Sequence, residues 1–134
     1  MDVMGGWDIE LELRERDRDY LGHVTAVAHL ALFEEAHARW LAEIMDEPAP
    51  PFVIVHLELD YRRELLIDDG PVTVSLKPVV LTNSTVTVHE RLGSAGKGVH
   101  TESRVILARW DRERRRSMPF PPRERQAIEA LLDR

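Results

Sequence analysis

Cysteine is absent from this chain of 134 residues, which excludes disulfide bonds and metal sites built on thiolates. No apolar run comes near the roughly 20 residues that a membrane-spanning helix needs. The start, MDVMGGWDIE, lacks a basic segment followed by an apolar one, so we expect no secretory signal peptide. We therefore expect a cytoplasmic protein without a membrane partner.

An excess of positive charge is also missing, since the formal net charge is −6. General nucleic-acid binding depends on a basic surface that neutralises phosphates, so we expect no nucleic-acid partner. The one basic run, RWDRERRR at 109–116, is either a solvated turn after a strand or a contact for a phosphorylated ligand. The histidines lie on different expected elements without compact ligand spacing, so we expect no metal site.

The composition that is present, 43% hydrophobic and 31% charged residues, is typical of a globular protein, and the length predicts a single domain over residues 1–134. Alternation in WDIELELR predicts a half-buried strand at 7–14. A helix is expected from Thr25, whose hydroxyl can cap it, to Met45, where the proline-rich DEPAPP follows. Its apolar face consists of Leu30, Phe33, His37, Trp40, Leu41 and Ile44.

Four more strands and a short helix are expected after this long helix. The strands are FVIVHLELDY (52–61), PVTVSLKPVV (71–80), STVTVHERL (84–92) and VHTESRVILARW (99–110), and the helix covers 123–132. Strand 52–61 should place Val53, Val55, Leu57, Leu59 and Tyr61 on one face. A parallel sheet would need crossover helices, which a chain with one long helix lacks. The sequence therefore predicts an α+β fold in which an antiparallel sheet packs on, or wraps around, one helix.

The loop DRDYLGHV, at 17–24 ahead of the long helix, carries the candidate chemistry. Its acids could simply favour the helix start, where the backbone has a partial positive charge. That alternative does not explain why Gly22 and His23 stand between Asp19 and the helix. Glycine lets the backbone approach a ligand closely, and a carboxylate facing free helix amides suits acyl transfer. The amides stabilise a carbonyl oxygen as it gains charge, while the carboxylate attacks the carbon or activates water.

Four segments of the sequence, DRDYLGHV, LFEEAHARWL, VHLELDYRRELLIDDGPVTV and SMPFPP, are similar to those of one family. Across residues 8–122 the chain resembles the hotdog-fold thioesterases of the 4-hydroxybenzoyl-CoA thioesterase type. The resemblance implies a hotdog fold, in which an antiparallel sheet of about five strands wraps around one long helix. It also implies an enzyme that hydrolyses an acyl thioester, carried by coenzyme A or by acyl carrier protein, to a free acid and a thiol without a cofactor.

The resemblance assigns roles to residues near the helix start. Asp19 matches the family's catalytic aspartate, a nucleophile or a general base, and Gly22 and His23 follow it at the family's spacing. The backbone N–H of Ala26 would polarise the thioester carbonyl. Thr25 and Ala26 stand where the family has two asparagines, whose side chains position water or substrate, and Thr25 is the remaining candidate contact. His23 either hydrogen bonds to the substrate or to Asp19, or serves only in packing or in hydrogen bonds within the loop.

Coenzyme A in the resembled family runs along the protein surface, with its phosphates held by basic side chains. The candidates in this chain are Arg62 and Arg63, at the end of an expected strand, and Arg112, Arg114 and Arg115 in the basic run. An acidic acyl carrier protein would also bind to arginines, so the carrier of the acyl group stays open.

Several alternatives remain beside this interpretation. Another class of hotdog thioesterases places its catalytic carboxylate on the long helix, but with Asp19 present we expect Glu34 and Glu35 on a solvated face, and His29 and His37 in the core or an interface. The same scaffold serves as a non-catalytic acyl-ligand-binding or assembly protein, which the missing asparagines favour. A hydratase would need a paired Asp and His motif that we do not find. Because an exposed sheet edge invites pairing, we expect a homodimer or a homotetramer.

Overall fold

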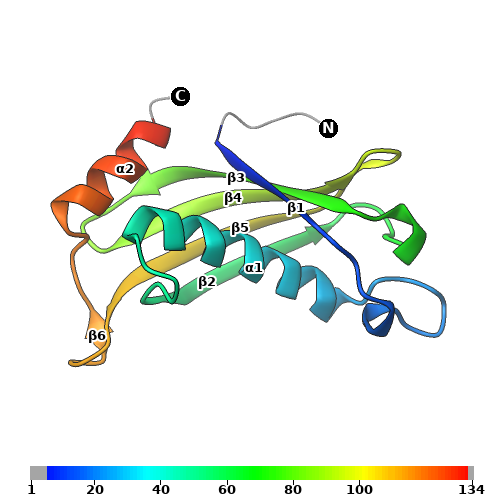
Figure 1. The fold of residues 1–134 in the computed structure, drawn as a ribbon, viewed down its shortest axis with the longest axis horizontal. Helices are drawn as coiled ribbons and strands as arrows, with labels where there is room; N and C mark the ends of the chain where they lie inside the picture. Colours follow the sequence, from blue (N-terminus) through cyan, green and yellow to red (C-terminus); the bar gives the residue numbers. More distant parts are fainter. Residues whose placement is uncertain (1–5, 133–134) are drawn as a thin grey trace.

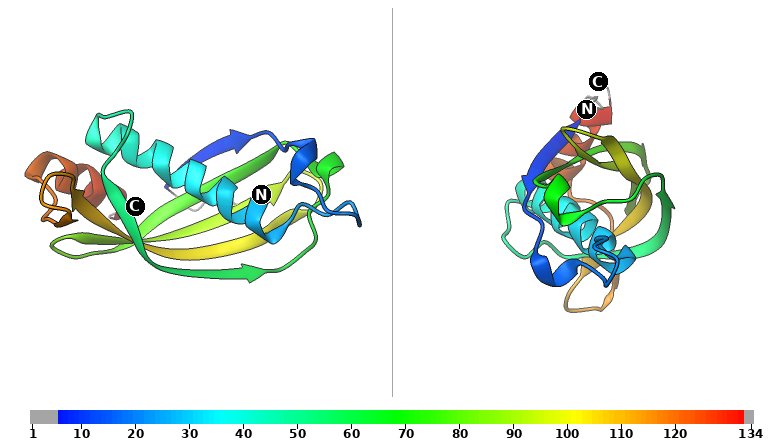
Figure 2. Two further views of the ribbon diagram at one scale, coloured as in Figure 1. Left: turned by 90° about the horizontal axis from the view of Figure 1, so that it is seen from below. Right: turned by 90° about the vertical axis from the view of Figure 1, so that its right-hand side faces the viewer.

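In the computed structural model, which describes residues 6–132, a curled antiparallel sheet surrounds one long helix (Figure 1). The helices are α1 (Ala26–Met45) and α2 (Pro122–Leu132), and the strands are β1 (Trp7–Leu11), β2 (Phe52–Tyr61), β3 (Val72–Leu81), β4 (Thr85–Ser94), β5 (Gly98–Asp111) and β6 (Arg116–Ser117). The main strands run in the order β1-β3-β4-β5-β2, and β6 pairs with β5. The end-on view in Figure 2 shows the sheet curving around α1. The α+β hotdog fold expected from the sequence is confirmed.

Helix α1 begins where the sequence predicts it. Thr25 is the N-cap, and its Oγ1 accepts a hydrogen bond from the backbone N–H of Ala28 at 3.1 Å, which satisfies one amide that the helix itself leaves unpaired. The helix ends at Asp46, whose φ of 51° lies in the left-handed region. Within the predicted apolar face, Leu30 is half-buried and the other members are buried.

The core lies between α1 and the face of the sheet that curves around it. Val72, Val74 and Leu76, which alternate along β3, are completely buried. Phe33 and Trp40 of α1 belong to the same cluster of buried residues. Full burial of one such side chain contributes about 1.5–3 kcal/mol, so this packing holds α1 against the sheet.

Strand β2 departs from its predicted alternation at Val55. Its pairing with β5 shifts register between Ile54 and His56, so Val55 is the extra residue of a β-bulge and is 56% exposed. Ile54 before the bulge and Leu57 after it both pack against the core, although they are three residues apart. The shared face predicted for Val53, Val55 and the residues after them is therefore wrong before the bulge and correct after it.

The boundaries of two other elements also differ from expectation. Strand β1 ends at Leu11 rather than at residue 14, and a short 3-10 helix, Glu15–Asp17, follows it. Helix α2 starts at Pro122, one residue before the expected start, because proline is suited to a first helical turn. Strands β1 and β2 form the two edges of the sheet, and the ten-residue β2 presents a long edge.

Candidate active site

The segment before α1 folds into a tight turn around Asp19. The backbone N–H of Asp19 donates to the carbonyl of His23 at 2.8 Å, and the N–H of Gly22 donates to the carbonyl of Asp19 at 3.1 Å. Gly22 has a φ of +85°, a left-handed conformation that favours glycine. A Cβ at this position would meet only open space, so the turn requires glycine for its backbone conformation and not for lack of room.

The carboxylate of Asp19 is held by this turn through one of its two oxygens. Oδ1 accepts hydrogen bonds from the backbone N–H groups of Leu21 at 2.9 Å and His23 at 3.0 Å. Oδ2 lies 3.9 Å from Nδ1 of His23, and the Asp19 side chain is one-third exposed. The turn thus fixes the orientation of the carboxylate and leaves Oδ2 for other contacts.

The first turn of α1 supplies backbone amides beside this carboxylate. Thr25 uses its hydroxyl to cap Ala28 and its carbonyl to accept from the N–H of His29 at 3.1 Å. Among the described residues, no hydrogen bond to the backbone N–H of Ala26 is found, as expected for the first residue of a helix. The hydroxyl of Thr25 is engaged in the cap, so a contact between this side chain and a substrate stays a prediction.

Asp19 and Ala26 line the same open cleft, which has a volume of about 400 Å³. Its walls come from the turn before α1, from the first turn of α1, and from the end of β2 with the connection that follows. The residues that line it are Asp19, His23, Val24, Thr25, Ala26, His29, Tyr61, Arg62, Arg63, Glu64 and Leu65. The structure therefore places Asp19 and the first residue of α1, which are seven residues apart in the sequence, in the lining of one cleft.

Glu64 is a member of this cleft that sequence reasoning missed. Its Oε2 lies 2.6 Å from Nε2 of His23, although 41 residues separate the two. The backbone places it there, because His23 pairs with Leu66 in an isolated bridge and the N–H of Val24 donates to the carbonyl of Leu65 at 2.7 Å. No local pattern in the sequence signals a contact between these two segments.

His29 lines the cleft from α1 and is almost completely buried, with 3% of its surface exposed. The expectation of a core position is therefore met, but the cleft position was missed. Its Nδ1 is hydrogen bonded to the hydroxyl of Thr101. Burial, and secondarily the charge of His100, lower the pKa of His29 from 6.5 to about 4, so its imidazole is neutral at neutral pH.

Tyr61 connects the end of β2 to the start of α1. Its phenol donates a hydrogen bond to the carbonyl of Ala26 at 3.1 Å, and its ring packs edge-on against His29 with 5.2 Å between the ring centroids. Burial raises the pKa of the Tyr61 phenol, which keeps it protonated as a donor. Tyr61 was predicted only as a strand residue, and its contact with α1 fixes the mouth of the cleft.

Residues 13–128 match the family described as the thioesterase-like superfamily. The chain belongs to this superfamily. No curated protein matches the sequence.

Solved structures show how closely the fold of this superfamily member follows that of other proteins. A Thermus thermophilus thioesterase in complex with coenzyme A and zinc is 28% identical, with a TM-score of 0.84 and 98% of each chain covered. A Bacillus stearothermophilus protein described as a predicted thioesterase is 19% identical, with a TM-score of 0.83 over 94% of this chain and 96% of that one. A Staphylococcus aureus protein in complex with coenzyme A is 15% identical, with a TM-score of 0.84 over 99% and 89%.

The arginines predicted to hold phosphates form two separate groups. Arg62 and Arg63 line the cleft; Arg62 pairs with Glu102 through its Nε at 3.1 Å and its Nη2 at 2.8 Å, and Arg63 donates to the carbonyl of Lys97 at 2.7 Å. The basic run 112–115 lies between β5 and β6 (orange in Figure 1), at the opposite end of the molecule from the turn before α1.

Arg112, Arg114 and Arg115 therefore do not line the cleft of their own chain. Arg112 instead contacts the carboxylate of Glu47 and the carbonyl of Ala49. Any role for these three arginines in binding a substrate at this cleft would require a second subunit, and it stays a prediction.

The glutamates of α1 lie away from the cleft of this thioesterase-like protein. Glu34 and Glu35 are exposed, and Glu35 pairs with Arg39 at 2.8 Å, as expected for a solvated face. His37, by contrast, is completely buried, and its Nδ1 lies 2.9 Å from the Oε2 of Glu90. The structure places no carboxylate of α1 in the candidate site.

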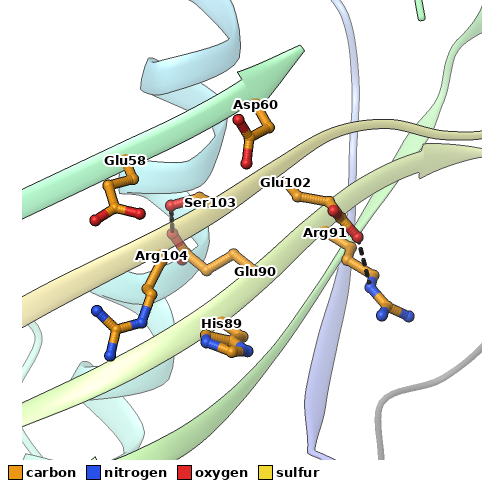
Figure 3. Close-up of a pocket in the computed structure, with 8 residues that line it drawn as sticks. All are labelled: Glu58, Asp60, His89, Glu90, Arg91, Glu102, Ser103 and Arg104. Carbon is orange, nitrogen blue, oxygen red and sulfur yellow. Dashed lines mark hydrogen bonds and ion pairs between the residues drawn. The ribbon is translucent and has the colours of Figure 1, made fainter. Parts of the chain in front are cut away.

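A second hollow, of about 290 Å³, lies on the outer face of the sheet (Figure 3). Glu90 faces α1 through its contact with His37, so the alternating neighbours His89 and Arg91 face outward. Acidic and basic side chains share this hollow, and some pair with one another, as Arg91 does with Glu102 at 3.1 Å. Its lining residues all come from strands and include no helix start, so the cleft at Asp19 is the better candidate for acyl transfer.

Within residues 6–132, neither helix combines the length and the apolar character needed to cross a membrane. In the same range, no group of three or more histidine, aspartate or glutamate side chains is arranged to hold a metal ion.

Proposed function

We propose that this protein hydrolyses an acyl thioester to a free acid and a thiol, with Asp19 as the catalytic carboxylate. The observation that carries the proposal is the shared cleft of Asp19 and the N-terminal amide of α1 at Ala26. An acyl transfer site needs a carboxylate near the carbonyl carbon and a donor near its oxygen. Membership in the thioesterase-like superfamily supports this reaction class.

The residues beside Asp19 at the start of α1 then have roles that follow from their geometry. The N–H of Ala26 donates to the thioester oxygen as that oxygen gains charge, and the helix start adds a partial positive charge there. Gly22 holds the turn that presents the carboxylate, and Thr25 holds the helix start. Water supplies the oxygen of the acid product, the carbon–sulfur bond breaks, and the thiolate leaves with a proton from the site.

Coenzyme A is the carrier that we propose for the acyl group. Structures of similar fold from T. thermophilus and S. aureus hold coenzyme A, and Arg62 and Arg63 border the cleft of this chain. Their guanidinium groups suit phosphate oxygens, although each now contacts another group of the protein. Within the superfamily we assign the chain to the 4-hydroxybenzoyl-CoA thioesterase type, on the loop and helix sequence around Asp19.

A homodimer or homotetramer is part of the same proposal. Among the described strands, β2 pairs with β5 alone, so one side of this ten-residue strand has no partner strand, and its exposed Val55 and Tyr61 lie on the same strand. Pairing of two such edges would extend the sheet. It would also place a second subunit beside the cleft, because Tyr61 belongs to both.

The deciding experiment measures thiol release from a panel of acyl-CoA thioesters, from acetyl to palmitoyl and including benzoyl, with a thiol-trapping dye. Asp19→Asn should lower kcat by about 10²–10⁴-fold, because the amide oxygen of asparagine can still accept the two backbone hydrogen bonds while its charge is lost. Asp17→Asn is the matched control, since Asp17 contacts Arg14 and does not line the cleft.

Full activity of Asp19→Asn would overturn the role of Asp19. Thermal stabilisation by the acyl-CoAs without any turnover would instead favour the non-catalytic acyl-ligand-binding protein, because a ligand that binds only the folded state raises its apparent stability.

A further inference from the structure

The imidazole of His23 is held between two carboxylates that come from different parts of the chain. Its Nε2 lies 2.6 Å from Oε2 of Glu64, and its Nδ1 lies 3.9 Å from Oδ2 of Asp19. All three residues line the cleft. Glu64 belongs to the connection after β2, which the backbone bond between Val24 and Leu65 fixes beside the turn before α1.

The contact with Glu64 decides which nitrogen of His23 carries a hydrogen. A carboxylate accepts hydrogen bonds, so the 2.6 Å contact requires a hydrogen on Nε2. In the neutral imidazole the other nitrogen, Nδ1, is then an acceptor. The Glu64 contact therefore turns an accepting nitrogen toward Asp19.

Asp19 presents a second acceptor across the same gap. Its Oδ1 already accepts two backbone hydrogen bonds, so Oδ2 is the oxygen that remains. The 3.9 Å between Oδ2 and Nδ1 of His23 is too long for a direct hydrogen bond. A water molecule has two O–H groups to donate, and two acceptors at this separation can each take one of them.

We propose that Glu64 is a positioning residue: by accepting the Nε2–H of His23 it turns Nδ1 toward Asp19, so that Nδ1 and Oδ2 together hold the water that hydrolyses the thioester. This inference rests on the proposed function and makes Asp19 a general base in it. With both hydrogens of the water accepted, an oxygen lone pair is left to attack the thioester carbon, whose oxygen is bound to the N–H of Ala26.

The reaction balances without any further reactant. The water oxygen bonds to the thioester carbon while one water proton passes to Oδ2 of Asp19. The tetrahedral intermediate collapses as the carbon–sulfur bond breaks, which gives the carboxylic acid and the thiolate. Asp19 returns its proton to the thiolate, and His23 keeps its hydrogen on Nε2 throughout, held by Glu64.

Kinetics of Glu64 variants test this role. In Glu64→Ala, kcat should fall by about tenfold or more, because the imidazole loses its orientation, while KM stays within about twofold. Glu64→Gln should keep most of the activity, since its amide oxygen can still accept the Nε2–H. Glu58→Ala is the matched control: Glu58 also accepts from a histidine, His56 at 2.8 Å, but away from the cleft, and this variant should match wild type.

A double variant tests whether Glu64 acts through His23. If it does, His23→Ala with Glu64→Ala should be no slower than His23→Ala alone, because the positioned group is already gone. A further loss in the double variant, a Glu64→Ala protein with wild-type kcat, or an effect on KM alone would overturn the proposal. Any of these results in an active wild-type enzyme would leave the proposed function itself intact.

Two measurements read the geometry and the water directly. Long-range ¹H–¹⁵N NMR of the free protein at alkaline pH should show His23 with its hydrogen on Nε2, and this signal alone among the histidines should change in Glu64→Ala; a hydrogen on Nδ1 would overturn the proposal. A single turnover in ¹⁸O water, with enzyme in excess, tests which group attacks the thioester carbon. If water attacks, the label should enter the acid product. Label in the Asp19 carboxylate would show that Asp19 attacks the carbon, and would overturn the proposed role of the water.

The two tests separate this proposal from the proposed function. Absence of turnover with every thioester of the panel would overturn both the proposed hydrolysis and the proposed role of the water. The NMR signal would still report whether Glu64 orients His23.

Discussion

Two histidine–carboxylate pairs in this protein use the same chemistry in opposite surroundings. His37 and Glu90, between α1 and β4, have fully buried side chains, whereas the side chains of His23 and Glu64, in the cleft, are 35% and 56% exposed. Glu90 also accepts a hydrogen bond from Ser103 at 3.0 Å. The buried pair joins the helix to the sheet, and the exposed pair joins two loops beside a candidate catalytic carboxylate.

The difference in burial indicates whether each pair acts mainly on the stability of the fold or on the orientation of a side chain. A buried polar group that loses its partner is costly, because no water replaces the lost hydrogen bond. An exposed ion pair contributes little to folding, because water and salt compete with it. The 2.6 Å contact of the exposed pair should therefore matter more for the orientation of His23 than for the stability of the fold.

The largest expected effect on stability comes from breaking the buried pair. Glu90→Ala leaves the Nδ1 of His37 and the hydroxyl of Ser103 without their partner, and we expect a loss of about 3–5 kcal/mol in the free energy of unfolding, measured by urea denaturation. Glu35→Ala, which removes the exposed partner of Arg39, is the control and should cost less than about 0.5 kcal/mol. A Glu90→Ala protein as stable as this control would contradict the comparison.

His29 differs from the histidines of both pairs. Among the described residues, its imidazole bonds to the hydroxyl of Thr101 and to no carboxylate. The pKa of His29 is lowered to about 4 from 6.5, so between these values the unfolded chain binds a proton that the folded chain does not. Stability should therefore fall as the pH drops from 6.5 toward 4, by about 3 kcal/mol in total.

The matched measurement is urea denaturation of wild type and His29→Gln at several pH values. The difference in unfolding free energy between the two proteins should change across this window and be constant above pH 6.5. His89→Gln, on the outer face of the sheet, serves as the control. A wild-type curve parallel to that of His29→Gln from pH 6.5 to 4 would show that burial of His29 does not disfavour its charged form.

Removal of the helix cap should have a smaller effect that reaches the cleft. Thr25→Ala deletes the acceptor for the N–H of Ala28, and we expect a loss of about 1 kcal/mol in unfolding free energy. Thr25→Ser keeps the acceptor and should stay close to wild type. Equal destabilisation by both variants would show that the methyl group of Thr25, and not the cap, matters.

The fold could be predicted further from the sequence than the site could. Alternating and helical spacings are local, so they predicted α1 and the strands β1 to β5, whereas the pairing of Asp19 with the amide of Ala26 came from the resemblance to the thioesterases. The bulge at Val55 was not predicted, because an extra residue in one strand has no local signature in the sequence. Glu64 was not predicted as a cleft residue, because 41 residues separate it from His23 in the sequence.

The arginines predicted to bind phosphates show the same limit, because residues grouped by the sequence can lie far apart in the structure. Similarity of charge placed Arg62 and Arg112 in one predicted binding group, yet Arg62 follows Tyr61, which pairs with Thr101 near the start of β5, and Arg112 follows the last residue of β5. At about 3.3 Å per residue, the ten residues from Thr101 to Asp111 span about 33 Å. The charge of two side chains does not indicate how far apart they lie, whereas the arrangement of the strands in the sheet does.

The smallest expected effect on stability comes from breaking the exposed pair. Glu64→Ala should change the free energy of unfolding by less than about 1 kcal/mol, because Glu64 is 56% exposed and His23 can bind water instead. The measurement is urea denaturation beside Glu90→Ala under the same conditions. A loss as large as that of Glu90→Ala would mean that Glu64 holds the two loops together, and a fall in kcat would then report a damaged cleft. A small loss combined with a large fall in kcat is the result expected if the carboxylate acts on the orientation of His23, and the double variant with His23→Ala then tests that route.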